Sequence, residues 1–152
     1  MLSKDEQANL PELYLKNDIK HYIIPVQDNL SHDISTYLQE TNNWIQDALK
    51  TGNVLVHCIL GVSRSASIVI SYLMHCRFIC YQVALDYVKD MRPRVNPNKA
   101  FEIQLKQYSK KLMIIEDEKP NSFMPFDTWD SSKYIEYDQK SCFPQISEHK
   151  IV

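Results

Sequence analysis

The sequence contains very little glycine, since only Gly52 and Gly61 occur among its 152 residues. Glycine adopts left-handed and sharply turned backbone conformations more readily than any other residue. Each of the two glycines is therefore expected where the backbone needs that freedom. Gly61 lies in a short stretch, VHCILGVSRS (56–65), that also contains a histidine, a cysteine and an arginine.

Long apolar runs and a secretory cysteine pattern are also absent. The longest apolar run, residues 66–74, is far too short to cross a bilayer. The sequence shows no signal-peptide pattern, and its cysteines form no paired framework. These cysteines are Cys58, Cys76, Cys80 and Cys142. We therefore expect a reducing compartment, the cytosol or the nucleus, in which Cys58 stays a free thiol.

Strong charge of either sign is missing as well. The 17 lysines and arginines nearly balance 19 aspartates and glutamates, which gives a net charge of -2. Such a balance gives no general attraction to nucleic acid or to anionic membranes, so neither is expected as a partner. Hydrophobic residues make up 44% of the chain, a fraction typical of one soluble globular domain. Any affinity for anions must then be local.

The sequence pattern predicts an α/β domain. Residues 21–26 (HYIIPV) and 53–58 (NVLVHC) are typical of strands, and the second suits a strand buried on both faces of a parallel sheet. Apolar residues at helical spacing follow each strand, an order that indicates an α/β fold. The predicted helices cover about 33–49, 64–76, 81–90 and 99–112.

Composition divides the chain into three parts. Residues 1–20 carry little pattern, residues 21–115 hold the predicted elements, and residues 116–152 form an acidic tail. The tail has eight carboxylates, four lysines, no arginine and three prolines, which is typical of a flexible extension. The alternative is that some of its scattered aromatic residues dock on the core or on a partner.

The loop that joins the second predicted strand to the next helix has the features of an anion site. Its backbone N–H groups can converge on one point, and the helix N-terminus adds positive charge. Arg64 supplies a planar, permanently charged group that matches two phosphate oxygens. The same surroundings lower a cysteine pKa from about 8.5 to about 3.5–7.5, so Cys58 is predicted to be a nucleophile. The residues expected around the phosphate are Ile59, Leu60, Gly61, Val62, Ser63 and Arg64.

Two neighbours of this loop are predicted to assist it. His57 can hydrogen-bond the loop backbone and hold its shape, although it can equally be a satisfied core histidine. Ser65 can donate a hydrogen bond to the Cys58 sulfur, or cap the helix that begins there. These two roles of Ser65 are compatible.

A carboxylic acid is needed to protonate the departing oxygen of a phosphoester and later to accept a proton from water. Asp28 and Asp33 both follow the first predicted strand. Asp33 stands at a predicted helix start, where a carboxylate is expected as a cap or as a partner of the helix dipole. Asp28 has no such structural explanation. Asp28 is therefore the predicted acid, with Asp33 as the alternative.

These motifs resemble those of a known family. VHCILGVSRSAS matches the cysteine-phosphatase signature His-Cys-x5-Arg-Ser in the form typical of dual-specificity protein phosphatases. PVQDNLSHDISTYL resembles the general-acid loop of that family, and RPRVNPNKAFEIQL resembles a later segment. The resemblance spans about residues 21–112.

The resemblance implies removal of phosphate from phosphotyrosine and from phosphoserine or phosphothreonine in proteins, without metal or other cofactor. It implies that Cys58 is the nucleophile, Arg64 the phosphate clamp and Asp28 the acid and base. Ser65 would assist the departing thiolate. The uncharged residues at 59, 60, 62 and 63 favour a protein substrate over a phosphoinositide or RNA.

The sequence departs from the family pattern at three points. Leu60 replaces the usual alanine, and Ala100 replaces the usual glycine. LPELYLKN (10–17) looks like the opening strand of the family, yet the segment that should follow it, including a strand between the two predicted here, is missing. The N-terminal strands are therefore expected to be missing or reduced.

Because these strands are missing, a second hypothesis remains open. The protein would then bind phosphoproteins or act as a scaffold, and its shortened domain would hydrolyse phosphoesters poorly. HCRFIC (75–80) contains three possible zinc ligands, although a helix and its turn explain them more simply. The sequence does not decide the oligomeric state.

Overall fold

The computed structural model describes residue 14 and residues 16–112. The acidic tail at 116–152, with its aromatic residues and Cys142, lies outside these residues, as does most of segment 1–20. The helices are α2 (Ser35–Ala48), α3 (Arg64–Arg77), α4 (Tyr81–Met91) and α5 (Lys99–Lys111). The helices predicted from apolar spacing are thus confirmed, with differences only at their ends.

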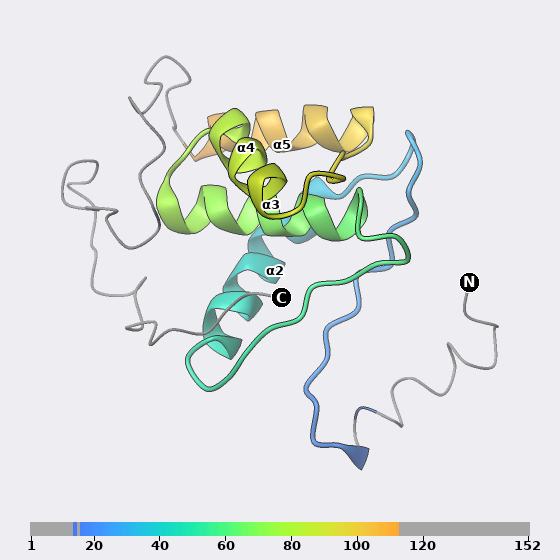
Figure 1. The fold of residues 1–152 in the computed structure, drawn as a ribbon, viewed down its shortest axis with the longest axis vertical. Helices are drawn as coiled ribbons and strands as arrows, with labels where there is room; N and C mark the ends of the chain where they lie inside the picture. Colours follow the sequence, from blue (N-terminus) through green and yellow to red (C-terminus); the bar gives the residue numbers. More distant parts are fainter. Residues whose placement is uncertain (1–13, 15, 113–152) are drawn as a thin grey trace.

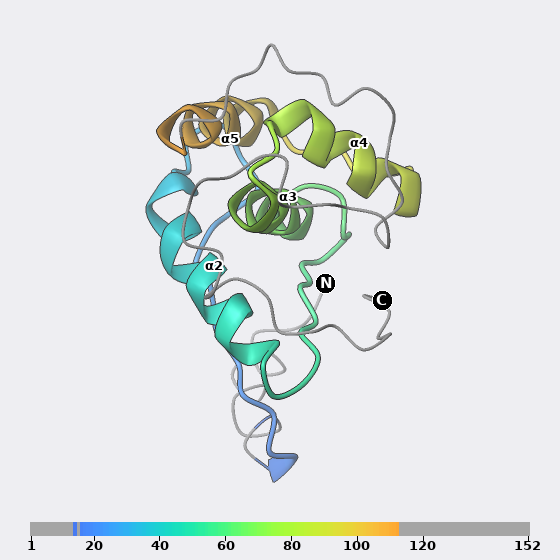
Figure 2. The ribbon, with the colours of Figure 1, turned by 90° about the vertical axis from the view of Figure 1, so that its left-hand side faces the viewer.

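Helix α3 is at the centre of the packing and contacts α2, α4 and α5 (Figures 1 and 2). Ile70 and Met74 of α3 are fully buried, together with Leu38 of α2 and Phe101 and Leu105 of α5. Burial of such apolar helix faces supplies most of the stability of helices in proteins. No helix in the described part of the chain is long and apolar enough to span a membrane.

Side chains of α5 and the turn before it fix the neighbouring loops. Asn98 caps α5, because its Oδ1 accepts a hydrogen bond from Phe101 N at 3.0 Å. Gln104 reaches the start of α2, where its Oε1 accepts from Ile34 N at 2.7 Å and its Nε2 donates to His32 O at 3.0 Å. The loop that precedes α2 is therefore held against α5.

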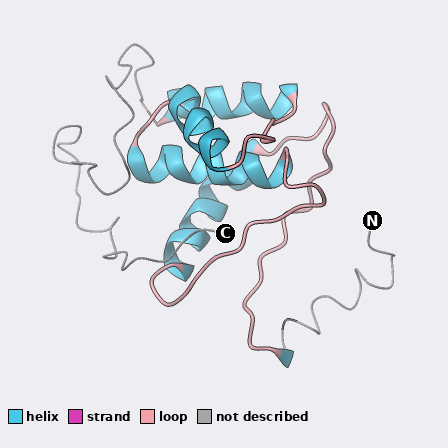
Figure 3. Ribbon diagram, viewed as in Figure 1, coloured by secondary structure: helices cyan, strands magenta, loops and turns pink. Residues whose placement is uncertain are grey.

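The strands predicted at 21–26 and 53–58 do not form, and Figure 3 shows no strand in the described residues. Ile23 is 64% exposed and Leu55 is 72% exposed, so burial of 53–58 on both faces is also wrong. Val54 and Val56 still pack partly against the core. A strand is held by hydrogen bonds to a neighbouring strand, and the described residues offer neither segment such a neighbour. The predicted sheet is therefore not confirmed.

The exposure of Leu55 gives a stability test. Leu55→Ser should change the free energy of unfolding by no more than about 0.5 kcal/mol, because the leucine covers no core residue. Val56→Ser, one position along, should cost about 1 kcal/mol or more, since Val56 contacts the core. Urea unfolding measures both. An equal or larger loss for Leu55→Ser would mean that a strand covers this residue in solution.

Candidate active site

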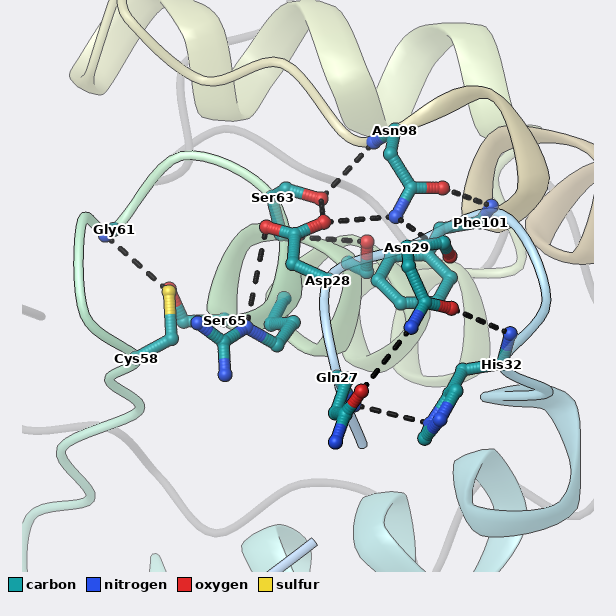
Figure 4. A network of polar contacts seen from close by, with 12 residues as sticks. Gln27, Asp28, Asn29, His32, Cys58, Gly61, Ser63, Ser65, Asn98 and Phe101 are labelled. Carbon is teal, nitrogen blue, oxygen red and sulfur yellow. Dashed lines mark hydrogen bonds and ion pairs between the residues drawn. The ribbon is translucent and has the colours of Figure 1, made fainter. Parts of the chain in front are cut away.

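The loop from Cys58 to Ser63 brings the predicted nucleophile to the N-terminus of α3 (Figure 4). Cys58 Sγ accepts a hydrogen bond from Gly61 N at 3.3 Å. It also lies 3.2 Å from the hydroxyl of Ser65, a buried residue in the first turn of α3. The partly buried thiol is therefore in contact with a loop N–H and a hydroxyl at the helix start.

The Cys58 thiol has a lowered pKa. Partial burial raises its pKa, but hydrogen bonds from the Ser65 hydroxyl and from the backbone N–H groups of Ser65, Gly61 and Leu60 outweigh this effect and lower the pKa to about 7. The positive end of the α3 dipole acts in the same direction. Cys58 therefore ionises more readily near neutral pH than an ordinary cysteine.

This pKa predicts the pH dependence of thiol chemistry. Alkylation of Cys58 by iodoacetamide should increase with pH with a midpoint near 7, because only the thiolate reacts. Ser65→Ala should move the midpoint upward, since it removes the hydroxyl hydrogen bond. Site-resolved mass spectrometry separates Cys58 from the other cysteines. A wild-type midpoint above 8, near that of a free cysteine at about 8.5, would contradict the described hydrogen bonds.

Gly61 confirms the expected need for glycine in this loop. Its φ is +65°, and a Cβ atom there would lie 2.9 Å from Nη2 of Arg92. Both the left-handed backbone and the close guanidinium disfavour any other residue. A Cβ at Gly52 would meet nothing within 4 Å, so only Gly61 is required by such a contact.

Arg64 offers a buried donor at the same site. Its Nε has no hydrogen-bond acceptor among the described residues. The carboxylate Oδ2 of Asp28 lies 3.9 Å from this nitrogen, close enough for an ion pair but too far for a hydrogen bond. An oxygen of a bound anion could therefore accept a hydrogen bond from Arg64 Nε.

The structure distinguishes the two candidate acids. Asp28 Oδ1 accepts hydrogen bonds from Ser63 Oγ and Asn98 Nδ2, both at 2.8 Å, which join it to the cysteine loop (Figure 4). Asp33 Oδ1 instead accepts from Ser35 N at 2.8 Å, at the start of α2. The geometry therefore groups Asp28 with Arg64, whereas the hydrogen bond of Asp33 is a local one just before α2, whose N-cap is Ile34.

Sequence reasoning missed the role of two residues in holding Asp28. Ser63 was predicted only as a phosphate-loop residue, and Asn98 only as part of the RPRVNPN segment. Asn98 N also donates to Ser63 Oγ at 3.0 Å, so the two residues form one support for the carboxylate. These contacts join residues 35 and 70 positions apart, which no local pattern reveals.

The remaining predicted residues lie at the surface of the loop. Ile59 and Leu60 are 59% and 65% exposed, and Val62 is partly buried. His57 is exposed and forms no hydrogen bond with another described residue, so its predicted bond to the loop backbone is not formed here. In residue 14 and residues 16–112, including 75–80, no group of three or more His, Cys, Asp or Glu could hold a metal ion.

A family model and several known proteins match most of this chain. The family model "Dual specificity phosphatase, catalytic domain" matches residues 2–111. MAP kinase phosphatase with leucine-rich repeats protein 3 of Dictyostelium discoideum is 40% identical over 102 residues, which are 66% of this chain and 12% of that protein. Human dual specificity protein phosphatase 5 is 42% identical over 91 residues, 59% of this chain and 24% of that protein.

A solved structure of a protein with a similar fold and sequence belongs to the same family. The crystal structure of DUSP15 is 36% identical, with a TM-score of 0.60, over 62% of this chain and 64% of that chain. Dual-specificity phosphatases have an α/β fold, although the described residues here form helices without strands. The chain spans only a small part of the curated relatives named above.

Proposed function

This chain belongs to the dual-specificity phosphatase family, and we propose that it hydrolyses phosphotyrosine and phosphoserine or phosphothreonine in proteins through a phosphocysteine intermediate. One observation carries the proposal. The Cys58 sulfur, with a pKa of about 7, lies at the N-terminus of α3 beside the buried donor of Arg64. A thiolate nucleophile and an anion-binding group are thereby combined in a single loop.

In the first step, the Cys58 thiolate attacks phosphorus. A sulfur–phosphorus bond forms, and the bond from phosphorus to the ester oxygen breaks. The loop N–H groups and the Arg64 guanidinium bind the non-bridging oxygens and stabilise the charge on them. Asp28 donates its proton to the leaving oxygen of the side chain. Its Oδ2 is the oxygen suited to this transfer, because Oδ1 already accepts two hydrogen bonds.

In the second step, water attacks the phosphocysteine. Asp28 takes a proton from that water, a new phosphorus–oxygen bond forms, and the sulfur–phosphorus bond breaks. Ser65 Oγ, 3.2 Å from Cys58 Sγ, stabilises the departing thiolate by a hydrogen bond. Phosphate is released and the thiolate is regenerated, so neither step uses a cofactor.

The uncharged loop favours a protein substrate. A phosphoinositide carries several phosphate groups and calls for further cations, yet residues 59, 60, 62 and 63 are isoleucine, leucine, valine and serine. A thiolate nucleophile also requires protection from oxidation. We therefore place the activity in a reducing compartment, the cytosol or the nucleus.

A substrate panel tests the proposal. Purified 1–152 is incubated with phosphotyrosine and phosphothreonine peptides, a phosphoinositide and a 5′-triphosphorylated RNA, and phosphate release is measured. Both peptides should be hydrolysed faster than the other two substrates. Faster hydrolysis of the lipid or RNA would overturn the substrate class, and binding of the peptides without turnover would favour a phosphoprotein-binding role.

A further inference from the structure

The segment between α4 and α5 contacts the outer side of the cysteine loop. Arg92 directly follows α4 as its C-cap, and its side chain reaches the loop, where Nε donates to Gly61 O at 3.1 Å and Nη2 donates to Leu60 O at 3.4 Å. Asn96 N donates to Val62 O at 2.9 Å. Three consecutive loop carbonyls, at residues 60, 61 and 62, are therefore hydrogen-bonded by one neighbouring segment.

The geometry of the peptide unit gives these bonds a consequence for the thiol. The carbonyl of Leu60 and the N–H of Gly61 belong to the same trans peptide, in which the two groups point in opposite directions. Arg92 holds the carbonyl, and the N–H donates to Cys58 Sγ at 3.3 Å. A rotation of this peptide would break both hydrogen bonds together.

The same reasoning extends along the loop. The carbonyl that Arg92 Nε holds belongs to the peptide whose N–H is that of Val62. The carbonyl held by Asn96 belongs to the peptide whose N–H is that of Ser63. Hydrogen bonding at a carbonyl also polarises the N–H of its peptide, which strengthens that group as a donor. Fixing the three carbonyls thus orients three successive donors.

The contact between Arg92 and Gly61 is specific in shape. Gly61 has no Cβ, so the guanidinium of Arg92 can lie close to its backbone. A Cβ at this position would be only 2.9 Å from Nη2 of Arg92. A guanidinium presents several N–H donors in one rigid plane and so can reach two successive carbonyls. The ammonium of lysine is a compact point charge on a flexible chain and does not reproduce this arrangement.

We propose that Arg92 is a positioning residue that fixes the Leu60–Gly61 and Gly61–Val62 peptides so that their N–H groups face the Cys58 sulfur and its bound phosphate. The proposal rests on the proposed phosphatase activity for its catalytic consequence. Its effect on the thiol does not depend on turnover. Arg92 contacts neither the sulfur nor the reacting atoms, and it acts through the loop backbone.

The test compares Arg92→Met and Arg92→Lys with Arg94→Met. Arg94 is an exposed arginine two positions along the chain, with no contact to the loop among the described interactions. The other charged or titratable groups of the site, His57, Asp28 and Arg64, are unchanged in all three variants. Two properties are measured, the pH profile of Cys58 alkylation and the kcat and KM for an aryl phosphate. Melting temperature reports on folding.

Arg92→Met should raise the alkylation midpoint of Cys58 by about half a unit to one unit. It should also raise KM and lower kcat/KM about tenfold, because the phosphate loses oriented donors. Arg92→Lys should recover only part of each change, and Arg94→Met should match the wild type. The melting temperature of every variant should stay within about 4 °C of the wild type, since these side chains are exposed.

Two results would overturn the proposal. One is a wild-type alkylation midpoint in Arg92→Met. The other is an equal shift in Arg94→Met, which would show a general effect of positive charge. If the midpoint shifts only in the Arg92 variants but the wild type hydrolyses no phosphoester, the positioning role stands and the proposed function fails.

Discussion

Replacing Cys58 with serine is expected to reduce phosphoester hydrolysis by about 10⁴-fold or more while preserving the fold. Serine has a similar size and can accept the same hydrogen bonds from Gly61 N and Ser65 Oγ. Its hydroxyl, however, does not ionise near pH 7, and no histidine or carboxylate among the described residues forms a hydrogen bond with Cys58 Sγ. Initial rates with an aryl phosphate, together with urea unfolding of both proteins, measure the effect.

Cys80→Ser provides the matched control. Cys80 precedes α4 and has no described contact with the cysteine loop, so this variant should keep full activity. The Cys58→Ser protein should still bind a phosphopeptide, since Arg64 and the loop N–H groups remain. Wild-type turnover in Cys58→Ser, or an equal loss in Cys80→Ser, would contradict the assignment of the nucleophile.

Replacing Asp28 with asparagine is expected to lower kcat by about 10²–10⁴-fold. Asparagine keeps an oxygen that can accept from Ser63 and Asn98, but it has no proton to donate to the leaving oxygen. The loss should be greatest with phosphothreonine, whose alkoxide is a poor leaving group, and smallest with an aryl phosphate of low phenol pKa. This dependence on the leaving group is specific to a proton donor.

Asp33→Asn distinguishes the second carboxylate. Asp33 lies just before α2, where its Oδ1 accepts a hydrogen bond from Ser35 N at 2.8 Å, and the amide oxygen of asparagine can accept the same bond. Its activity should therefore remain within about twofold of the wild type. A larger loss of activity in Asp33→Asn than in Asp28→Asn would mean that Asp33, and not Asp28, is the general acid. Loss of activity at Asp28 that is equal for every leaving group would indicate a structural role instead.

The helices and the cysteine loop could be predicted from the sequence because each depends on residues close together in the chain. Apolar spacing over a few turns predicted α2 to α5, and the cysteine, glycine and arginine of the loop lie within seven residues. The predicted strands are not confirmed in the described residues for the opposite reason. HYIIPV and NVLVHC have strand-forming residues, but a strand also requires a distant partner for its hydrogen bonds.

The contacts that hold the candidate catalytic residues were likewise not predictable from the sequence pattern. Ser63, Asn98 and Arg92 act through contacts between the cysteine loop and segments more than 30 residues away. Serine, asparagine and arginine are common in loops and at helix ends, so their presence alone predicts no such contact. Their roles follow only when helices α3, α4 and α5 place the loops together.

The most direct test of the account is acid quenching of the purified chain during turnover, followed by mass spectrometry of the cysteine peptides. The proposed mechanism predicts the mass of one phosphoryl group on Cys58 alone, with more of it in Ser65→Ala, whose thiolate departs less readily. Phosphate released with no phosphoryl group on Cys58 in either protein, or a phosphoryl group on another residue, would contradict the mechanism.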